Sequence, residues 1–181
     1  AIGQPIPAES IAIRESYLQA ATFVGRQAEK EQLLHAVEEA KQRRGSAWLV
    51  SGESGVGKSR LLDEIATQAL VQGALVLRGQ GVEDVGGSPL QLWRDVLRRL
   101  VLTVPLDDLA VGVLQALIPD IERLLGRTVP PAPELDSAAA RQRLISTITG
   151  LFSSQSQCIL LILEDLQWAE PGLEILQQLT R

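Results

Sequence analysis

The sequence lacks methionine, contains one cysteine among 181 residues, and has only 3% aromatic residues. A single cysteine, Cys158, excludes an intrachain disulfide and a metal site built from cysteines. It favours a reducing compartment, so we expect a cytoplasmic protein. Long hydrophobic runs are also missing: Ile159–Leu163 covers five residues, whereas a membrane-spanning helix needs about 20. We therefore expect no membrane partner.

No initiator methionine precedes Ala1, and the first 30 residues have none of the features of a signal peptide. We interpret the chain as a piece of a longer protein. Its 22 acidic and 17 basic residues give a formal net charge of −5, and the basic residues are scattered along the chain. Because binding through phosphate neutralisation requires the opposite balance, we expect no direct nucleic-acid binding by this segment. Length and a hydrophobic content of 45% predict about one globular domain.

The first half of the chain alternates between strand and helix patterns. Residues 1–22 contain Pro5 and Pro7 and follow no period, so we interpret them as a linker or N-terminal arm. Helices are then indicated by apolar residues three or four positions apart, and strands by short apolar runs, the first of which places Trp48 in the core. In chain order these elements cover 27–44 (helix), 47–51 (strand), 59–72 (helix) and 74–77 (strand). The order strand, helix, strand predicts a βαβ unit with parallel strands.

The second half of the chain is mainly helical until a last strand. We expect a helical insertion over about 89–153, which packs as a lid on the sheet, with Asp136 or Ser137 capping its final helix. Residues 158–163 are apolar at every position, as in a strand inside a parallel sheet. The run ends at Glu164 and Asp165, and residues 171–181 are typical of the start of a further helix.

Residues 52–59, Gly-Glu-Ser-Gly-Val-Gly-Lys-Ser, match the pattern G-x-x-x-x-G-K-[ST] at every fixed position. The chance of one such match in a chain of this length is roughly half a percent. Glycines allow a tight turn whose N–H groups point inward, at the positive end of the following helix. In this motif Lys58 would reach the β- and γ-phosphates, and the Ser59 hydroxyl would bind Mg²⁺. The motif predicts a site for a polyphosphate nucleotide.

Glu164 and Asp165 are the second candidate element of this site. They follow a predicted parallel strand, so they lie at the carboxyl edge of the sheet, where the phosphate loop also lies. One carboxylate could hold Mg²⁺ while the other orients or deprotonates the attacking water. The alternative interpretation is a solvated acidic turn after the strand.

The segments GESGVGKSRLL and ILLILEDLQWAEP, preceded by Phe23-Val24-Gly25-Arg26, resemble the ATPase module of the signal-transduction branch of the AAA+ superfamily, the STAND ATPases. The resemblance covers about 23–181. It implies an α/β, three-layer P-loop NTPase fold with about five parallel strands in the order 5-1-4-3-2. Only three are predicted here, so we expect a P-loop domain at 23–181 that is incomplete at its C-terminus. The missing strands include the one between 47–51 and 158–163.

The resemblance also assigns residues to the nucleotide. Val24, Gly25 and Arg26 would lie against the adenine. The phosphate site would comprise Gly52, Glu53, Ser54, Gly55, Val56, Gly57, Lys58, Ser59 and Arg60. Lys58, Glu164 and Asp165 would act in catalysis, and Ser59, Glu164 and Asp165 at the metal. The family usually has aspartate as the first acid after the strand, so the presence of Glu164 leaves open which acid holds the metal.

The implied function is an ATP-binding, slowly hydrolysing, Mg²⁺-dependent regulatory switch in a multidomain signalling protein. The alternative is a scaffold module that binds ADP and does not hydrolyse ATP. Expected partners are other domains of the same polypeptide, such as tetratricopeptide repeat, Ser/Thr protein kinase, cyclase or DNA-binding domains, and self-association is a further expectation. The sequence contains no N-K-x-D element, which argues against a GTPase, and no L-S-G-G-Q element, which argues against an ABC-type ATPase.

Overall fold

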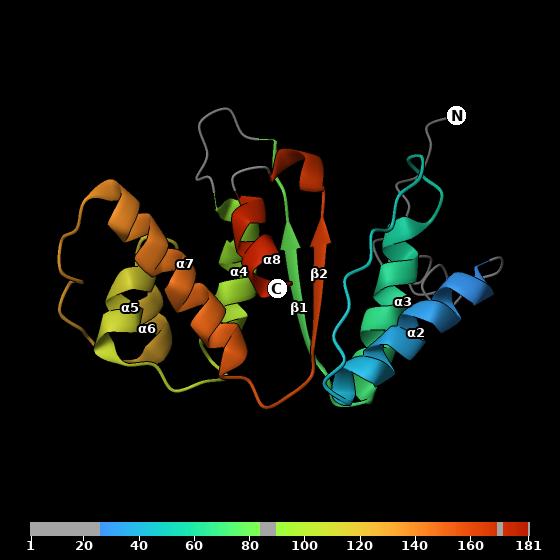
Figure 1. The fold of residues 1–181 in the computed structure, drawn as a ribbon, viewed down its shortest axis with the longest axis horizontal. Coiled ribbons are helices and arrows are strands. Elements are labelled where there is room, and N and C mark those ends of the chain that lie inside the picture. The colour runs from blue at the N-terminus through green and yellow to red at the C-terminus, as the bar shows by residue number, and fades with distance from the viewer. Residues whose placement is uncertain (1–25, 84–89, 170–171, 181) are drawn as a thin grey trace, which may run out of the picture.

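The computed structural model describes residues 26–83, 90–169 and 172–180 (Figure 1). The predicted arm at 1–22 lies outside these residues. Helices and strands form an α/β arrangement that follows most of the predicted order. The elements are α2 (Gln27–Lys41), α3 (Lys58–Val71), β1 (Leu75–Gln80), α4 (Gln91–Leu100), α5 (Asp108–Leu114), α6 (Ile121–Leu125), α7 (Ser137–Ser153), β2 (Ile159–Glu164), the short 3₁₀ helix η1 (Leu166–Trp168) and α8 (Leu173–Leu179).

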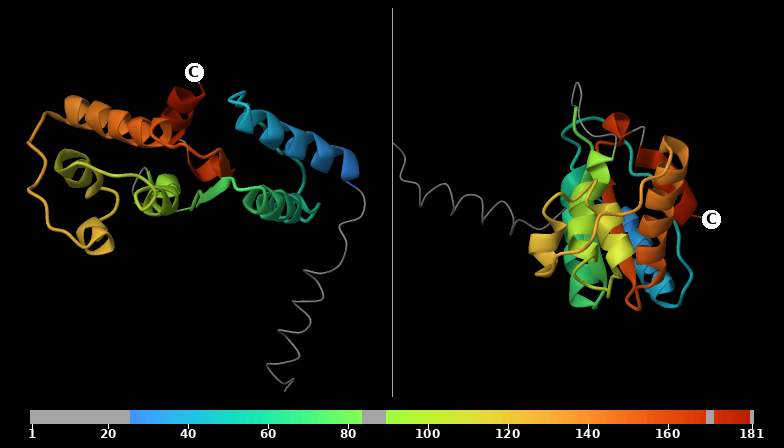
Figure 2. Two further views of the ribbon diagram at one scale, coloured as in Figure 1. Left: turned by 90° about the horizontal axis from the view of Figure 1, so that it is seen from below. Right: turned by 90° about the vertical axis from the view of Figure 1, so that its left-hand side faces the viewer.

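Strands β1 and β2 pair in parallel, with a register that runs from Leu75 opposite Ile159 to Gln80 opposite Glu164. β1 is longer than the apolar run at 74–77, because this pairing continues to its polar end. Viewed along the strands, the sheet lies between α4 on one face and α3 on the other (Figure 2). The three layers expected of a P-loop NTPase are therefore present, with two paired strands in the part of the chain that the structure describes.

The prediction of a strand at 47–51 is wrong. These residues follow α2 as irregular chain and pair with neither described strand. Trp48 and Leu49 are 54% and 82% exposed, so the prediction that Trp48 lies in the core is also wrong. A strand is stabilised by hydrogen bonds to a neighbouring strand and by burial of its faces. The implied strand order puts another strand between 47–51 and β2, and none lies there among the described residues.

Separate hydrophobic clusters cover the two faces of the sheet, because successive side chains of a strand point to opposite faces. Leu77 of β1 belongs to a large cluster that extends through α4, α5 and α7. The adjacent Val76 packs against a small cluster. Half-buried Cys158 packs there too, and burial raises the pKa of its thiol. The buried members of the small cluster are Val37, Leu61, Ile65, Ala69 and Ala74.

Helices α4 to α7 lie between β1 and β2 in the chain, where the sequence predicts a helical insertion. α4 packs against β1, and α7 contacts α4, α5 and α8. Asp136 caps α7, since its carboxylate accepts hydrogen bonds from the backbone N–H groups of Ala138 and Ala139 at 3.1 and 3.0 Å. Trp93 of α4 is fully buried and donates from Nε1 to the carbonyl oxygen of Gly172 at 2.8 Å. These contacts make α4 to α7 a cover on one face of the sheet.

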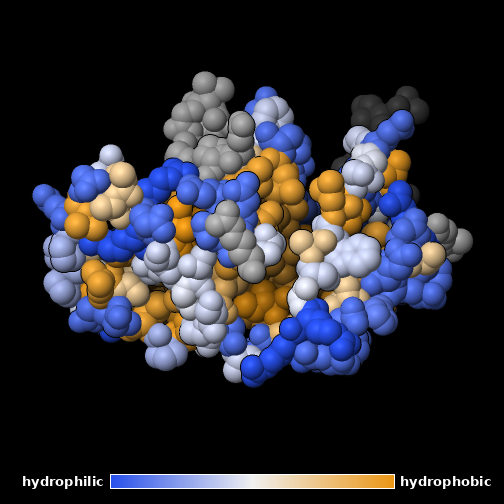
Figure 3. Space-filling view, viewed as in Figure 1, coloured by the Kyte–Doolittle hydropathy of each residue, from blue (hydrophilic) through white to orange (hydrophobic). Residues whose placement is uncertain are grey.

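The surface of β2 is less protected than its apolar sequence predicts. Only Ile162 of this strand is buried, and its other residues are partly exposed. Figure 3 shows apolar surface over the middle of the molecule, where β2 lies. The open surface is on the side of the strand that β1 does not occupy, which agrees with the absence of a second neighbour among the described residues. Within these residues, no helix combines the length and apolar character needed to span a membrane.

Candidate nucleotide-binding site

The glycine-rich loop 52–59 leads directly into α3. Gly55 and Gly57 have φ angles of 79° and 86°, which side chains with a Cβ atom rarely adopt, and Gly57 is the residue that caps the helix. The first turn of α3 therefore starts inside the loop, and the backbone N–H groups of this turn form the positive end of the helix dipole. Residues 52–56 of the loop are exposed, while Gly57 and Lys58 are half-buried. This is the local geometry that binds phosphate groups.

Lys58 is the first residue of α3, and its side chain turns back over the loop. Its Nζ atom donates hydrogen bonds to the carbonyl oxygens of Gly52 at 2.9 Å and Glu53 at 2.8 Å. The ammonium group is thus held at the loop by the loop's own backbone. A phosphate oxygen that arrives there would replace these neutral carbonyl acceptors with a charged acceptor. The ammonium group would bind it more strongly, because donor and acceptor would then carry opposite charges.

Ser59 and Glu164 are 105 residues apart in the chain and in contact in the structure. Ser59 Oγ donates to Glu164 Oε1 at 3.0 Å. The carboxyl end of β2 and the first turn of α3 therefore meet at one edge of the sheet, as the positions of the two motifs predict. A hydroxyl and a carboxylate oxygen are the ligand types that Mg²⁺ prefers. The donor set at this contact fits a magnesium ion that is also bound by phosphate oxygens and water.

Asp165 has a different set of neighbours from Glu164. Its backbone is left-handed, with φ 54° and ψ 44°, which turns the chain at the end of β2. Its Oδ2 atom accepts a hydrogen bond from Gln80 Nε2 at 2.9 Å. The two adjacent acids are therefore held separately, Glu164 by the helix that follows the loop and Asp165 by the last residue of β1.

Arg78 is a neighbour of the site that belongs to none of the sequence motifs. Its Nη1 atom lies 2.6 Å from Asp63 Oδ1 and 3.8 Å from Glu164 Oε2. The available signal was the pair of polar residues Arg78 and Gln80 at alternate positions of an otherwise apolar strand. Alternate positions share one face, so both had to lie on the same side of the sheet.

Two of the three residues implied to contact the adenine, Val24 and Gly25, lie outside the described residues. Arg26 is half-buried and immediately precedes α2. The start of α2 is held against α3 by an ion pair between Lys30 and Glu64. A contact between Arg26 and a nucleotide stays a prediction. Arg60, the third residue of α3, is half-buried beside Ser59 in the sequence.

The described residues contain no cluster of three or more His, Cys, Asp or Glu side chains suited to hold a metal ion by themselves. A magnesium ion at Ser59 and Glu164 would therefore need ligands from phosphate groups and water. That is the usual situation for Mg²⁺, which keeps several water ligands and uses one or two carboxylates together with substrate phosphates. The described residues therefore give no indication of a structural metal site whose ligands all come from protein side chains.

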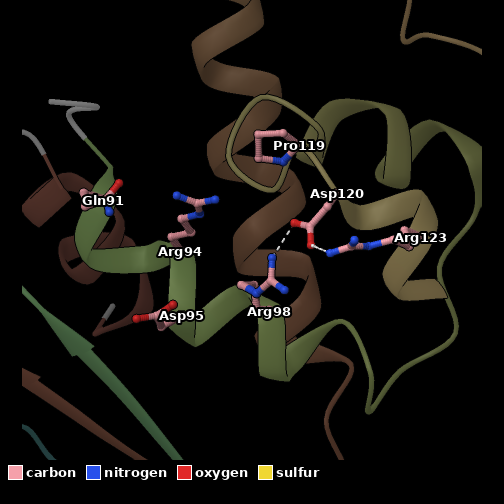
Figure 4. Close-up of a pocket in the computed structure, with 7 residues that line it drawn as sticks. All are labelled: Gln91, Arg94, Asp95, Arg98, Pro119, Asp120 and Arg123. Atoms are coloured by element: carbon pink, nitrogen blue, oxygen red, sulfur yellow. Dashed lines mark hydrogen bonds and ion pairs between the residues drawn. The ribbon is translucent and has the colours of Figure 1, made fainter.

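A polar groove of about 670 Å³ lies apart from this site (Figure 4). Arg98 of α4 donates a hydrogen bond to Asp120, which Arg123 also approaches. The hydrogen bond from Arg98 lowers the pKa of the Asp120 carboxyl. None of the predicted nucleotide or metal residues lines this groove, which is formed by Gln91, Arg94, Asp95, Arg98, Pro119, Asp120 and Arg123.

A glycine-rich loop that opens a helix, its lysine and serine, and an acid at the end of a parallel strand define a P-loop nucleotide-binding module. The family model described as AAA ATPase domain matches residues 22–181. The chain belongs to this family, so it is a P-loop AAA-type ATPase module. Searches of curated proteins and of solved structures found no significant match.

Proposed function

We propose that this chain binds ATP with Mg²⁺ and hydrolyses it slowly, as the switch module of a larger signalling protein. The hydrogen bond of 3.0 Å between Ser59 and Glu164 carries this proposal. It joins the end of the phosphate loop to the acidic end of β2, so that one site can hold phosphate groups, a metal ion and a water molecule. A solvated acidic turn without a function in the site would have no reason to contact the P-loop serine.

The proposed roles follow from the neighbours of each residue. The amides of loop 52–59, Lys58 and Arg60 bind the phosphates, and Val24, Gly25 and Arg26 bind the adenine. Ser59 and Glu164 hold Mg²⁺, which when bound supplies positive charge to the phosphate oxygens. Asp165, whose carboxylate is directed to the end of β1, orients or deprotonates the attacking water. We therefore assign the metal to Glu164 and the water to Asp165.

The broader setting is part of the same proposal. Residues 1–22 serve as a linker, residues 23–181 as the ATPase domain, and about 89–153 as its helical insertion. The module is of the STAND type and acts in the cytoplasm on other domains of its polypeptide, of the repeat, kinase, cyclase or DNA-binding kind. Nucleotide exchange alters how these domains and further copies of the module associate.

A module that binds ADP and does not hydrolyse ATP is the second candidate function. The position of Arg78 favours it, since this cation lies 3.8 Å from the carboxylate proposed to hold Mg²⁺. A neighbouring positive charge weakens the binding of a second cation to the same carboxylate. The same feature supports slow rather than fast hydrolysis in the first proposal.

Calorimetric titration and single-turnover hydrolysis test the two functions. We expect Lys58→Ala to weaken ATP binding by about 10- to 100-fold, because charge-assisted hydrogen bonds to phosphate are lost. Lys41→Ala, a lysine on the surface of α2, is the matched control and leaves binding unchanged. ATP binding that is equally tight in the Lys58 variant would contradict the proposed phosphate site.

Hydrolysis is tested with the two acids separately. Asp165→Asn keeps the size of the side chain and removes its charge, and we expect single-turnover hydrolysis to fall by about 100-fold or more. Glu164→Gln should raise the Mg²⁺ concentration that hydrolysis requires. Wild-type protein that binds ATP and ADP but does not hydrolyse ATP would select the second function. Equal affinity for GTP and ATP would exclude the proposed adenine contacts.

A further inference from the structure

The polar groove on the α4 side of the molecule has walls from two separate parts of the chain (Figure 4). One wall is the side of α4 that carries Gln91, Arg94 and Arg98, which are three and four residues apart and so share one face of the helix. The opposite wall is the turn at Pro119 and the start of α6. The other side of α4 is buried in the large hydrophobic cluster, which holds this helix in place. The groove is therefore formed before any ligand arrives.

Asp120 joins the two walls and fixes the arginine beside it. It immediately precedes α6 and accepts a hydrogen bond from Arg98 Nη1. Arg123 Nη2 lies 3.4 Å from the other carboxylate oxygen of Asp120. A guanidinium group has five N–H donors, and the contact with Asp120 uses one nitrogen of Arg98. The other donors of Arg98 have no hydrogen-bond acceptor among the described residues, so they are available to a ligand.

Arg94 contacts no acid and no other hydrogen-bond acceptor in the part of the chain that the structure describes. It lies one turn before Arg98, it is half-buried, and its side chain extends toward the turn at Pro119 (Figure 4). The side chain of Asp95 points away from this space. Arginine binds carboxylates through a planar fork of donors. Arg94 and the available donors of Arg98 therefore form a place for a carboxylate.

A smaller hollow of about 140 Å³ continues the groove past Arg94. Part of its lining is apolar, so an aliphatic side chain placed there would be removed from water. Gln91 lines both spaces and is exposed, and its amide can donate and accept hydrogen bonds. The apolar residues that line the hollow are Leu90, Ala116, Leu117 and Pro119.

The lining favours a protein segment over other anionic ligands. A carboxylate for the arginines, an aliphatic side chain for the hollow and a backbone amide for Gln91 all occur within a few residues of one polypeptide. Small-molecule pockets enclose most of their ligand, whereas this groove is open to solvent. A nucleic acid fits less well, because two aspartates accompany the three arginines and the whole chain has a net charge of −5.

We propose that the groove between α4 and α6 binds an acidic segment of a partner protein. A carboxylate of this segment lies between Arg94 and Arg98, and a neighbouring aliphatic side chain fills the hollow at Ala116. The groove contains none of the residues assigned to the nucleotide or the metal ion. The inference is therefore independent of the proposed ATPase function.

The experiment measures the binding of fluorescently labelled synthetic peptides by fluorescence anisotropy. The probe peptide has a leucine followed by consecutive glutamates, between flanking glycine and serine residues. In one comparison peptide glutamine replaces every glutamate, and in the other serine replaces the leucine. We expect wild-type protein to bind the probe about 5- to 20-fold more tightly than the glutamine peptide, because the charge-assisted hydrogen bonds are lost. The serine peptide should bind about threefold or more weakly, since the hollow stays unfilled.

Variants of the two parts of the groove test them separately. Arg94→Ala should weaken binding of the probe by about 5- to 20-fold, and Arg94→Lys should restore only part of this loss, because lysine lacks the planar fork. Arg99→Ala, an exposed arginine of α4 outside the groove, is the control and leaves binding unchanged. Ala116→Phe fills the hollow from the opposite wall, so it should abolish the preference for leucine over serine and keep the preference for glutamate over glutamine. Thermal unfolding and ATP affinity of the Arg94 variants should match those of wild type.

Several outcomes would overturn the proposal. Absence of binding to the probe, or equal binding of the glutamate and glutamine peptides, would exclude a carboxylate site in the groove. Equal losses in Arg94→Ala and Arg99→Ala would mean that general surface charge attracts the peptide. Displacement of the probe by inorganic phosphate, together with equal binding of the leucine and serine peptides, would assign the groove to a small anion in place of a protein segment.

Discussion

The two faces of the sheet differ in what they contribute to the molecule. On the α4 face, the cluster of buried residues among the described positions has 19 members, whereas the cluster on the α3 face has five. The phosphate loop, Ser59 and the acid contacts all lie on the face with the small cluster. Burial of apolar surface is the main favourable term in folding. The comparison therefore indicates that α4 to α7 supply most of the stability, while the thin α3 layer supplies the chemistry.

Substitution of Trp93 should have the largest effect on the stability that we assign to the α4 side. It is fully buried, packs edge to face on Phe152 with ring centroids 6.1 Å apart, and donates to Gly172. We expect Trp93→Ala to lower the free energy of unfolding by about 3–5 kcal/mol, measured by denaturant titration. This loss is a large part of the roughly 5–15 kcal/mol of a typical domain.

Trp48→Ala is the matched control for Trp93, and it also tests the corrected strand. Trp48 is 54% exposed, so its removal should change the free energy of unfolding by no more than about 0.5 kcal/mol. A loss as large as that of Trp93→Ala would mean that residues 47–51 are buried in solution.

Ile65 tests whether the small cluster on the α3 side holds the phosphate loop in place. It is 2% exposed in the small cluster and lies on α3, the helix that carries Ser59. We expect Ile65→Ala to lower the free energy of unfolding by about 2–4 kcal/mol. The folded fraction of this variant should bind ATP more weakly than wild type, whereas the folded fraction of Trp93→Ala should bind it equally well. Ile65→Val, with an expected cost of about 0.5–1.5 kcal/mol, is the conservative comparison. Unchanged nucleotide affinity in folded Ile65→Ala would show that the small cluster does not hold the loop in place.

Gly81 tests the close packing between the end of β1 and Asp165, at the edge of the sheet that holds the acids. A Cβ atom there would collide with the carbonyl oxygen of Asp165, so Gly81→Ala should cost about 1–3 kcal/mol and slow hydrolysis more than it weakens binding. Gly150→Ala, on the exposed side of α7 with no atom within 4 Å of the new Cβ, is the control. It should stabilise the protein by up to about 1 kcal/mol. Equal effects of the two substitutions on unfolding would contradict the close packing at Gly81.

Asp120 carries the smallest expected effect, on the surface of the α4 side. Arg98 lowers the pKa of Asp120 in the folded state, so the contact stabilises the protein above the unfolded pKa of about 3.9 and loses this effect as the pH falls through the folded value. We expect Asp120→Asn to unfold at a lower temperature than wild type at pH 7, with a difference that narrows as the pH is lowered below about 3.9. Asp95→Asn, in the same groove, is the control. A difference that grows on acidification would contradict the assigned partner.

Sequence reasoning succeeded where a structure depends on neighbours in the chain or on a general rule of parallel sheets. A cap on α7 at Asp136 or Ser137 was predicted because a cap needs only the next few residues, and the structure has it at Asp136. The placement of Glu164 at the sheet edge that also holds the phosphate loop followed from the rule that the carboxyl ends of parallel strands share an edge. The strand at 47–51 failed because a strand requires a partner that a local apolar run does not specify. The contacts of Arg78 and Gln80 with the two acids were missed for a related reason, since the acids lie 85 residues or more away in the chain.

The parallel pairing of β1 and β2 has a mechanical consequence. In a parallel pair, the chain leaves β1 at the edge that holds the acids and enters β2 at the opposite edge. The segment that carries α4 to α7 therefore joins the acid-bearing end of the sheet to its opposite end. A displacement at Gln80 would act on this segment where it leaves β1, while its other end, at Ile159, is held by the pairing of β2.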